Sequence, residues 1–559
     1  MKRHSSFVVG AILIAFCLVS HSAVAQPSWA KKASKSVFTL KTFTEDGIQQ
    51  SESKGFFVST DGEALGCYKP FRGASRAIVV DASGKEWEVE AVLGASETYD
   101  VARFKVGVKK SQSLTLSSER QLVGAPLWLL PYRETKNLPE GYVRRAETFK
   151  SQYDYLTLTM TMPENTAGAP LLNEAGEVVG VMQQPNTQGD SLSYAVSALF
   201  ADSLKTTGLS LNDPVYQAIR MKVALPSDLN QALLSLFVAN SLDSVRHAQL
   251  LEDFILQFPE EQDGYIARAQ WAASYGDYGK ADADMVQAAK IGKKVDEAHF
   301  SYARLIYQTL LTSTAMPFES WTFQKALQEA EEAYRVNPQP TYQYQQAAIL
   351  YTMKRFDEAY AVYASLFDSN LRSAELFFEA SQCKAQQNDT TAQLALLDSC
   401  MAQFTQPYLK EAAPFLLVRA QVRLDAQRYR DAVADLNAYE QLMKTQLVDN
   451  FYYIRYQAEV GGRLYQQALN DIDQAISMNP KNEFYYAEKA SLLVRVGLYD
   501  EAIATAESLL ELVPSDSNGY LFKGLALCLK GDKAEGIKNL RKAKELGDPQ
   551  ADTLIEKYQ

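Results

Sequence analysis

A period of 34 residues runs through the second half of the chain and limits what that half can fold into. The segments 449–482 and 483–516 are each 34 residues long and share an aromatic residue at position 17, alanine at position 20 and proline at position 32. In order, these residues are Tyr465, Ala468 and Pro480, and Tyr499, Ala502 and Pro514. Small residues let two helices approach closely, and proline ends a helix, so each period predicts one pair of packed helices.

This pattern resembles the tetratricopeptide repeat. The segment 517–550 continues in phase, although its proline, Pro549, comes one place late. Similar units can be followed back to residue 228, which gives about nine units over 228–559, with 552–558 expected as a capping helix. The resemblance implies an all-α superhelix whose concave face binds protein or peptide partners.

In repeats of this family the first helix of each unit lines the concave groove, which implies an aromatic peptide-binding groove here. The expected groove residues are Tyr307, Tyr344, Tyr351, Phe377, Tyr453, Gln457, Phe484 and Arg495. The alternative is that several of them pack between neighbouring helices. The Lys and Asn clamp with which some family members hold a C-terminal carboxylate is not recognisable, so this ligand class is not expected in the groove.

The segment 34–208 has a different pattern, with short runs rich in β-branched and aromatic residues. Turns rich in Gly, Asp, Asn and Ser separate these runs, so they predict an all-β barrel or sandwich. The runs are 36–43, 55–59, 76–81, 86–94, 101–106, 125–131, 142–149 and 155–160. The residues 209–227, with two prolines, are the expected linker to the helical half.

The segment 165–181 reads NTAGAPLLNEAGEVVGV and predicts a β-hairpin around a Glu-Ala-Gly turn. It resembles the nucleophile loop of trypsin-like serine proteases of the HtrA/Deg branch. Three further segments match this branch in the same order, namely 55–74, 96–106 and 193–204. The resemblance implies a trypsin-like double β-barrel over 34–208.

The same resemblance places the triad nucleophile on Ala167, the histidine on Lys69 and the aspartate on Asp100. Alanine has no oxygen that could attack a carbonyl. A serine nucleophile needs an adjacent base, and no histidine lies between Gln26 and Arg246. We therefore expect no catalytic residues, and a Lys69–Asp100 ion pair rather than two solvated charges. The turn at 165–167 could still receive a peptide carbonyl without turnover.

The N-terminus has the pattern of an export signal. Lys2 and Arg3 precede an apolar run from Phe7 to Val19, and Ala23-Val24-Ala25 is a small-x-small cleavage pattern. We expect residues 1–25 to be removed and the product to be periplasmic or secreted. The alternative is a membrane anchor, for which the run is short.

Charge and cysteine content exclude several function classes. The chain has 56 Lys and Arg against 67 Asp and Glu, a net charge of -11, and no basic stripe, so nucleic acid is not an expected partner. Outside the leader, Cys67, Cys383, Cys400 and Cys528 fit neither a zinc motif nor a disulfide framework. Cys383 and Cys400 could pair, or both could be free. His247 and His299 have no partners at metal spacing, so no metal or cofactor is expected.

Three functions are compatible with this pattern. The first is an exported, non-catalytic scaffold that binds partners through its repeats. The second is a serine-type endopeptidase with non-standard catalytic residues. The third is a holdase or decoy that captures peptides in the inactive cleft. The sequence leaves the oligomeric state open.

Overall fold

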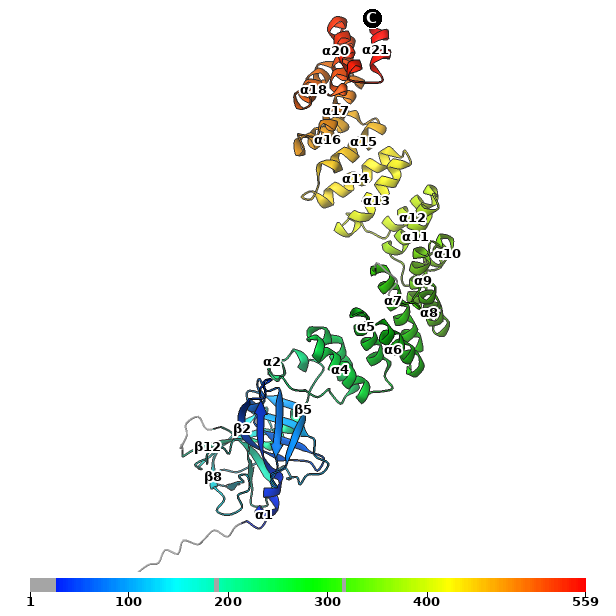
Figure 1. Ribbon diagram of the computed structural model, residues 1–559. Helices are drawn as coiled ribbons and strands as arrows, with labels where there is room; N and C mark the ends of the chain where they lie inside the picture. Colours follow the sequence, from blue (N-terminus) through cyan, green and yellow to red (C-terminus); the bar gives the residue numbers. More distant parts are fainter. Residues whose placement is uncertain (1–26, 185–190, 314–317) are drawn as a thin grey trace, which may run out of the picture. The chain divides into compact units, whose positions relative to one another are not determined.

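The computed structural model describes residues 27–184, 191–313 and 318–559 (Figure 1). The chain forms two compact units, one up to Trp271 and one over Ala272–Gln559. The predicted signal segment, 1–25, lies outside the described residues. Within the described residues, no helix is both long and apolar enough to cross a membrane.

The first unit contains two closed antiparallel barrels of six strands each, which confirms the predicted double barrel. After a short helix α1 (Ala30–Ala33), the first barrel has the order β1-β2-β3-β6-β5-β4 and the second has the order β10-β11-β12-β9-β8-β7. The strands of the first barrel are β1 (Val37–Phe43), β2 (Gln49–Phe57), β3 (Glu63–Gly66), β4 (Arg76–Val80), β5 (Glu86–Ser96) and β6 (Val101–Val106). Those of the second are β7 (Pro126–Leu129), β8 (Glu140–Phe149), β9 (Tyr153–Leu158), β10 (Pro170–Leu172), β11 (Val178–Met182) and β12 (Ser193–Ser197).

Neighbouring residues of one strand serve two different cores. Phe57 points into the first barrel, where its ring lies 4.8 Å from that of Phe38. Phe56 points the other way, into a cluster that also contains Leu65 and Val101 from the first barrel and Leu172 from the second. Successive side chains of a strand face opposite sides, so one strand can fill a barrel and also fasten it to its neighbour.

The expected linker is tied to the first barrel by backbone hydrogen bonds. It contains η4 (Ser210–Asn212) and α2 (Pro214–Gln217), and its connecting segment, Ile219–Ala224, runs along the barrel. Arg220 N donates to Ala74 O at 3.1 Å, and Val92 N donates to Lys222 O at 2.9 Å. The helices α3 (Leu229–Val238), α4 (Ser244–Gln257) and most of α5 (Gln262–Ser274) belong to this first unit. The compact units thus divide after Trp271, whereas the change of sequence pattern falls at 228.

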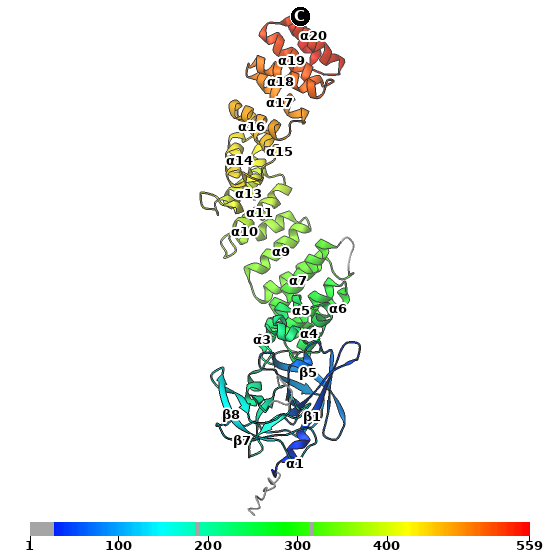
Figure 2. The same ribbon diagram turned by 90° about the vertical axis from the view of Figure 1, so that its left-hand side faces the viewer.

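The second unit is all-α (Figure 2). From α7 to α20 consecutive helices pack as pairs, α7 with α8 through α19 with α20, and α21 follows them. The helices are α6 (Tyr278–Ile291), α7 (Val295–Thr312), α8 (Phe323–Val336), α9 (Pro340–Thr352), α10 (Phe356–Ser365), α11 (Ala374–Gln386), α12 (Thr390–Met401), α13 (Ala413–Asp425), α14 (Tyr429–Met443), α15 (Asp449–Gly461), α16 (Tyr465–Met478), α17 (Glu483–Arg495), α18 (Tyr499–Leu512), α19 (Ser517–Lys530), α20 (Lys533–Glu545) and α21 (Ala551–Tyr558). This arrangement confirms the predicted stack of helix pairs.

One left-handed residue stands before the second helix of most pairs and explains the tight connection. At position 15 of the repeat, Gly497 has a φ of 82° and Gly531 a φ of 113°. The same conformation is adopted without glycine at Gln427 and Arg463, each with a φ of 60°. A residue in this region ends one helix and reverses the chain, and position 17, which is Tyr465 or Tyr499 in the two regular units, then begins the next helix.

Candidate functional site

The three residues at the expected triad positions come from both barrels. Lys69 begins a short 3-10 helix, η2 (Lys69–Phe71), after β3 of the first barrel. Asp100 directly precedes β6 of that barrel and has a φ of 47°. Ala167 lies in the turn before β10 of the second barrel and is buried.

Lys69 and Asp100 are bound to each other twice. The backbone N of Lys69 donates to Oδ1 of Asp100 at 2.8 Å, and its Nζ lies 3.6 Å from Oδ2. The carboxylate is 7% exposed, whereas the lysine side chain is 67% exposed. The ion pair is the one that the sequence predicted, and the structure adds a backbone amide that holds the buried carboxylate.

The nucleophile loop keeps a defined backbone although Ala167 has no hydroxyl. Asn165 and Gly168 have positive φ angles of 58° and 85°. Lys54 N donates to Ala167 O at 2.8 Å, and Gly168 N donates to Met182 O at 2.8 Å. A Cβ on residue 168 would stand 2.1 Å from Lys54 O, so only glycine fits there.

The hydroxyl of Thr166 and the thiol of Cys67, close in the chain to Ala167 and Lys69, are already engaged. Thr166 Oγ1 donates to Pro163 O at 2.6 Å and is buried. Cys67 Sγ donates to Met182 O at 3.6 Å, the carbonyl that also accepts the Gly168 N–H. Burial raises the pKa of the Cys67 thiol well above its usual range, and the charge of Asp100 adds to this effect. Sequence reasoning did not single out Cys67, although it stands two residues before Lys69.

Three of the expected groove aromatics meet between α7, α9 and α10. The Tyr307 hydroxyl lies 3.0 Å from Thr352 Oγ1. The Tyr344 ring lies 5.6 Å from that of Tyr363, and the Tyr351 ring 5.4 Å from that of Phe356. Each is partly exposed. These side chains therefore pack between helices and still present part of their surface.

Phe377 is placed differently from the other expected groove residues. It is 4% exposed, and its ring stacks 4.6 Å from that of Phe367. Phe377 is therefore a packing residue, which was the alternative to a place in the groove.

A second group lies on α15 and α17. The rings of Tyr453 and Phe484 are 5.3 Å apart, and Gln457 Nε2 donates to the Tyr453 hydroxyl at 2.9 Å. Phe484 is 48% exposed. Arg495, at the end of α17, stands 5.6 Å from the ring of Tyr465. This group, which we call the α15–α17 aromatic surface (Tyr453, Gln457 and Phe484), is the most open part of the expected groove.

Two neighbouring units contain buried arginine–aspartate pairs that sequence reasoning missed. Arg455 holds Asp471 through two hydrogen bonds, at 2.6 and 2.9 Å, and also donates to Glu440 at 2.6 Å. One unit earlier, Arg419 holds Asp435 at 3.0 and 2.6 Å. In each pair the arginine and the aspartate are 16 residues apart, and the two pairs stand at equivalent repeat positions. This repeated spacing could have indicated the pairs from the sequence.

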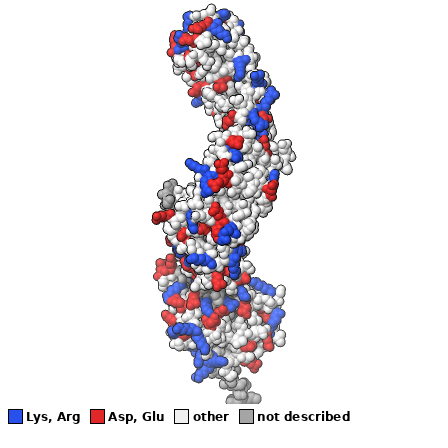
Figure 3. Space-filling view, turned by 90° about the vertical axis from the view of Figure 1, so that its right-hand side faces the viewer, with Lys and Arg blue, Asp and Glu red and all other residues white. Residues whose placement is uncertain are grey.

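The cysteines of the helical region are unpaired, and its two histidines have local partners. Cys383 and Cys400 are free and buried, which is the second of the two alternatives that the sequence left open. Burial raises the pKa of the Cys383 thiol to about 11 and that of the Cys400 thiol to about 12. His299 Nδ1 lies 2.5 Å from Glu329 Oε2, and His247 lies beside Trp271. Over the described ranges no group of three or more His, Cys, Asp or Glu side chains is placed to hold a metal ion. On the face drawn in Figure 3, basic and acidic side chains are interspersed.

Comparisons with known proteins identify both kinds of domain. The family described as trypsin-like peptidase domain matches residues 53–181. The chain is 30% identical over 96 residues to small glutamine-rich tetratricopeptide repeat-containing protein 2 of Saccharomyces cerevisiae, which is 17% of this chain and 28% of that protein. It is 29% identical over 87 residues to the SGT1 homolog of Bos taurus (16% and 26%), and 31% identical over 92 residues to DnaJ homolog subfamily C member 7 of Homo sapiens (16% and 19%). The chain thus matches less than a third of the length of each of these relatives. With the two barrels and the paired helices, these matches show that the chain joins a trypsin-like peptidase domain to a tetratricopeptide-type repeat array.

Proposed function

We propose that the chain is an exported scaffold protein that binds protein or peptide partners through its repeats and does not cleave them. The observation that carries the proposal is the pair Lys69–Asp100 together with Ala167. Lysine and alanine stand where the trypsin-like pattern has its base and its nucleophile, and the one retained acid is bound to the lysine. Export is proposed from the N-terminal leader pattern.

The surroundings of Ala167 argue against a substitute nucleophile. The Thr166 hydroxyl is buried and donates to a carbonyl, and the Cys67 thiol is buried with a raised pKa. A nucleophile has to be exposed to substrate and activated by a base, and neither group meets both conditions. These contacts favour the scaffold over a serine-type endopeptidase with non-standard residues.

The repeat array supplies the surface for partners. A stack of helix pairs offers an extended face, and aromatic side chains are the most frequent anchors of protein interfaces. The α15–α17 aromatic surface has such an anchor in Phe484, which is half exposed. The tetratricopeptide repeat in the name of the yeast relative is consistent with this use of the array.

Two measurements on the full-length chain test the proposal. A fluorophosphonate probe and unfolded casein should reveal neither labelling nor cleavage, and labelling of the mature chain would refute the non-catalytic part. Partners captured from envelope extract should be lost with Phe484→Asp and retained with Leu409→Asp, a control at an apolar residue that is more exposed than Phe484. Capture that is unchanged by Phe484→Asp would contradict binding at this surface.

Peptide capture in the inactive cleft is a second candidate, favoured by the ordered backbone of the nucleophile loop. A turn fixed by the hydrogen bonds of Ala167 O and Gly168 N can present amides to a peptide carbonyl without any chemical step. The same capture experiment can use an Ala167→Tyr variant, whose larger side chain is designed to fill the cleft. If this change removes partners that Phe484→Asp leaves bound, the cleft is the recognition site.

A further inference from the structure

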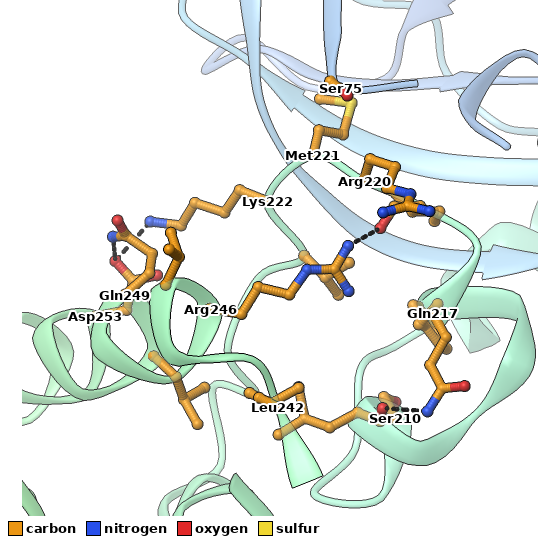
Figure 4. Close-up of a pocket in the computed structure, with 16 residues that line it drawn as sticks. Ser75, Ser210, Gln217, Arg220, Met221, Lys222, Leu242, Arg246, Gln249 and Asp253 are labelled. Atoms are coloured by element: carbon orange, nitrogen blue, oxygen red, sulfur yellow. Dashed lines mark hydrogen bonds and ion pairs between the residues drawn. The ribbon is translucent and has the colours of Figure 1, made fainter. Parts of the chain in front are cut away.

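A pocket of about 400 Å³ lies in the first unit, outside the barrel cleft (Figure 4). Its walls are the connecting segment Ile219–Ala224, the helix α4 and the residues around η4 and α2. Ile219 and Leu250 are buried in it, and Met221 and Leu242 add partly exposed apolar surface. A pocket with an apolar floor and a few polar groups at its edge is the usual form of a ligand site.

The charged groups of this pocket are unequal in number. Three cations line it, Arg220, Lys222 and Arg246, against one carboxylate, Asp253. Lys222 Nζ donates to Asp253 at 2.6 Å, which neutralises that pair, and Figure 4 shows it reaching across to α4. The side chain of Arg220 is exposed and has no hydrogen-bond or ion-pair partner among the described residues. Arg246 Nε lies 3.6 Å from Oδ2 of Asp243, which stands outside the lining, so the excess of positive charge beside the apolar floor is that of Arg220.

The hydrogen bonds of the connecting segment show which of its backbone groups face the barrel and which face away from it. Arg246 Nη2 donates from α4 to Ile219 O at 3.2 Å. Residues 220, 222 and 224 direct backbone groups to the barrel, at Ala74 and Val92. Since backbone groups alternate along an extended chain, those of Val223 face away from the barrel, as the carbonyl of Ile219 does. Among the described residues, neither N–H nor C=O of Val223 has a hydrogen-bond partner.

The unpaired backbone of Val223 forms a free strand edge. This edge is short because the carbonyl groups on both sides of it are already hydrogen-bonded. Arg246 occupies Ile219 O at one end, and Gln257 Nε2 donates to Pro226 O at 2.8 Å at the other. An edge of this length accommodates two or three residues of a peptide at about 3.3 Å per residue. A ligand that pairs with it has to end or turn close to the arginines.

We propose that this pocket binds the C-terminal end of an extended polypeptide, which adds as a short strand beside Val223. The apolar side chain of the last residue lies on the floor at Ile219 and Leu250, and the terminal carboxylate is held by Arg220 and Arg246. Main-chain hydrogen bonds provide affinity in such strand addition, and the cations select the chain end. The proposal goes beyond the scaffold function and does not rest on it, since it uses no residue of the repeat groove or of the cleft.

Fluorescence polarisation with the full-length protein tests the site. The probe is a fluorescein-labelled hexapeptide, Gly-Ser-Val-Ile-Val-Leu, with a free C-terminal carboxylate, and the comparison is the same peptide with an amidated end. The free acid should bind about tenfold or more tightly than the amide, because the amide has no charge to pair with the arginines. Arg220→Glu should reduce binding of the acid by a similar factor. Lys109→Glu, a change at an exposed cation outside the pocket, should leave it unchanged.

A second readout separates strand addition from simple attraction of an anion. Hydrogen exchange at the Val223 amide should slow when the free-acid peptide is bound and should not slow with laurate, an apolar anion without backbone amides. Equal binding of acid and amide would overturn the proposal, as would equal effects of Arg220→Glu and Lys109→Glu. Laurate binding with no peptide binding would assign the pocket to lipid anions and overturn it as well.

Discussion

The backbone N–H of Lys69 donates to Oδ1 of Asp100 at 2.8 Å, and the Nζ of the same residue lies 3.6 Å from Oδ2. The amide contact is short and buried on the carboxylate side, whereas the ammonium group is two-thirds exposed. The amide therefore fixes the carboxylate, and the side chain mainly balances its charge at the surface.

This difference predicts unequal costs of removing each partner. Lys69→Ala should reduce the stability of the barrels by less than about 1 kcal/mol, because exposed ion pairs contribute little. Asp100→Ala leaves the Lys69 N–H without its acceptor and should cost about 1–3 kcal/mol. Local hydrogen exchange in β3 and β6 measures both values. A larger loss for Lys69→Ala than for Asp100→Ala would show that the ammonium group is the principal contact.

Restoring the two missing groups should restore reactivity only when both are present. Asp100 is in place, and the loop backbone at Gly168 is fixed, so Lys69→His with Ala167→Ser rebuilds the constellation that activates a serine. The double variant should react with a fluorophosphonate probe at least about tenfold faster than either single variant, because serine without a base is a weak nucleophile. Equal labelling of the single Ala167→Ser variant would mean that another base is in reach.

Gly168→Ala should be strongly destabilising, and Gly124→Ala is its matched control. Both glycines have a φ near 85–88°, so both substitutions introduce the same left-handed strain of about 1–2 kcal/mol. Only at Gly168 would the new Cβ meet backbone, 2.1 Å from Lys54 O, whereas nothing lies within 4 Å at Gly124. We expect about 2 kcal/mol or more of additional loss for Gly168→Ala, measured by hydrogen exchange across the barrels. Similar losses for the two variants would show that the loop moves away from Lys54.

Some parts of the fold and of the site could be predicted from the sequence and others could not, because some depend on local residues and others on contacts between distant segments. The hairpin β10–β11 was predictable because its turn, its apolar runs and its returning strand are local. The first part of β2, Gln49–Lys54, was not, because its polar residues become a strand only by pairing with β1. The contacts of Cys67 depend on Met182 in the other barrel, so no local pattern shows them.

The boundary between the two compact units, after Trp271, could not be predicted from local sequence patterns either. The change from strand-like to helical sequence at 228 marks where helices begin, and α3 does begin at Leu229. α4 contacts the connecting segment through side chains such as that of Arg246, which donates to Ile219 O, and these residues have no distinctive spacing. The repeats were predictable in contrast, because one period of small, aromatic and proline residues recurs along the chain.

The buried carboxyl group of Glu459 predicts a pH dependence of the α15–α16 pair. Burial raises the pKa of Glu459 to about 8, the charge of Asp471 adds to this, and Arg455 opposes it. Its Oε2 has no hydrogen-bond partner among the described residues. The folded state therefore keeps a proton that the unfolded state loses near pH 4.5, and stability falls as pH rises from about 4.5 to about 8.

Glu459→Gln removes this titration and should stabilise the pair above pH 8 by an amount on the order of a few kcal/mol. Below about pH 4.5 the variant and the parent should be alike, since both then carry an uncharged side chain. Hydrogen exchange of α15 and α16 at several pH values checks this, with the exposed Glu556→Gln as control. A difference between variant and parent that does not change with pH would contradict the prediction.

The two arginine–aspartate pairs should respond differently to the same substitution, because their surroundings differ in charge. Asp435 accepts hydrogen bonds from both Arg419 and Arg423, and the only other carboxylate that these arginines reach in the described structure is Asp398. Asp435→Asn keeps an acceptor oxygen but removes the charge, so two guanidinium groups with little exposure are left with one carboxylate, the partly exposed Asp398, and the change should cost about 3–5 kcal/mol.

Asp471→Asn leaves Arg455 in contact with Glu440 at 2.6 Å and removes a negative charge that acts on Glu459. Its cost should be lower, about 1–2 kcal/mol, because one charge of the pair remains satisfied and a repulsion disappears. Hydrogen exchange of α13–α14 and of α15–α16 measures each loss in its own helix pair. Equal losses would mean that the bidentate contact alone, and not the balance of neighbouring charges, sets the stability of these pairs; a greater loss for Asp471→Asn would reverse the argument.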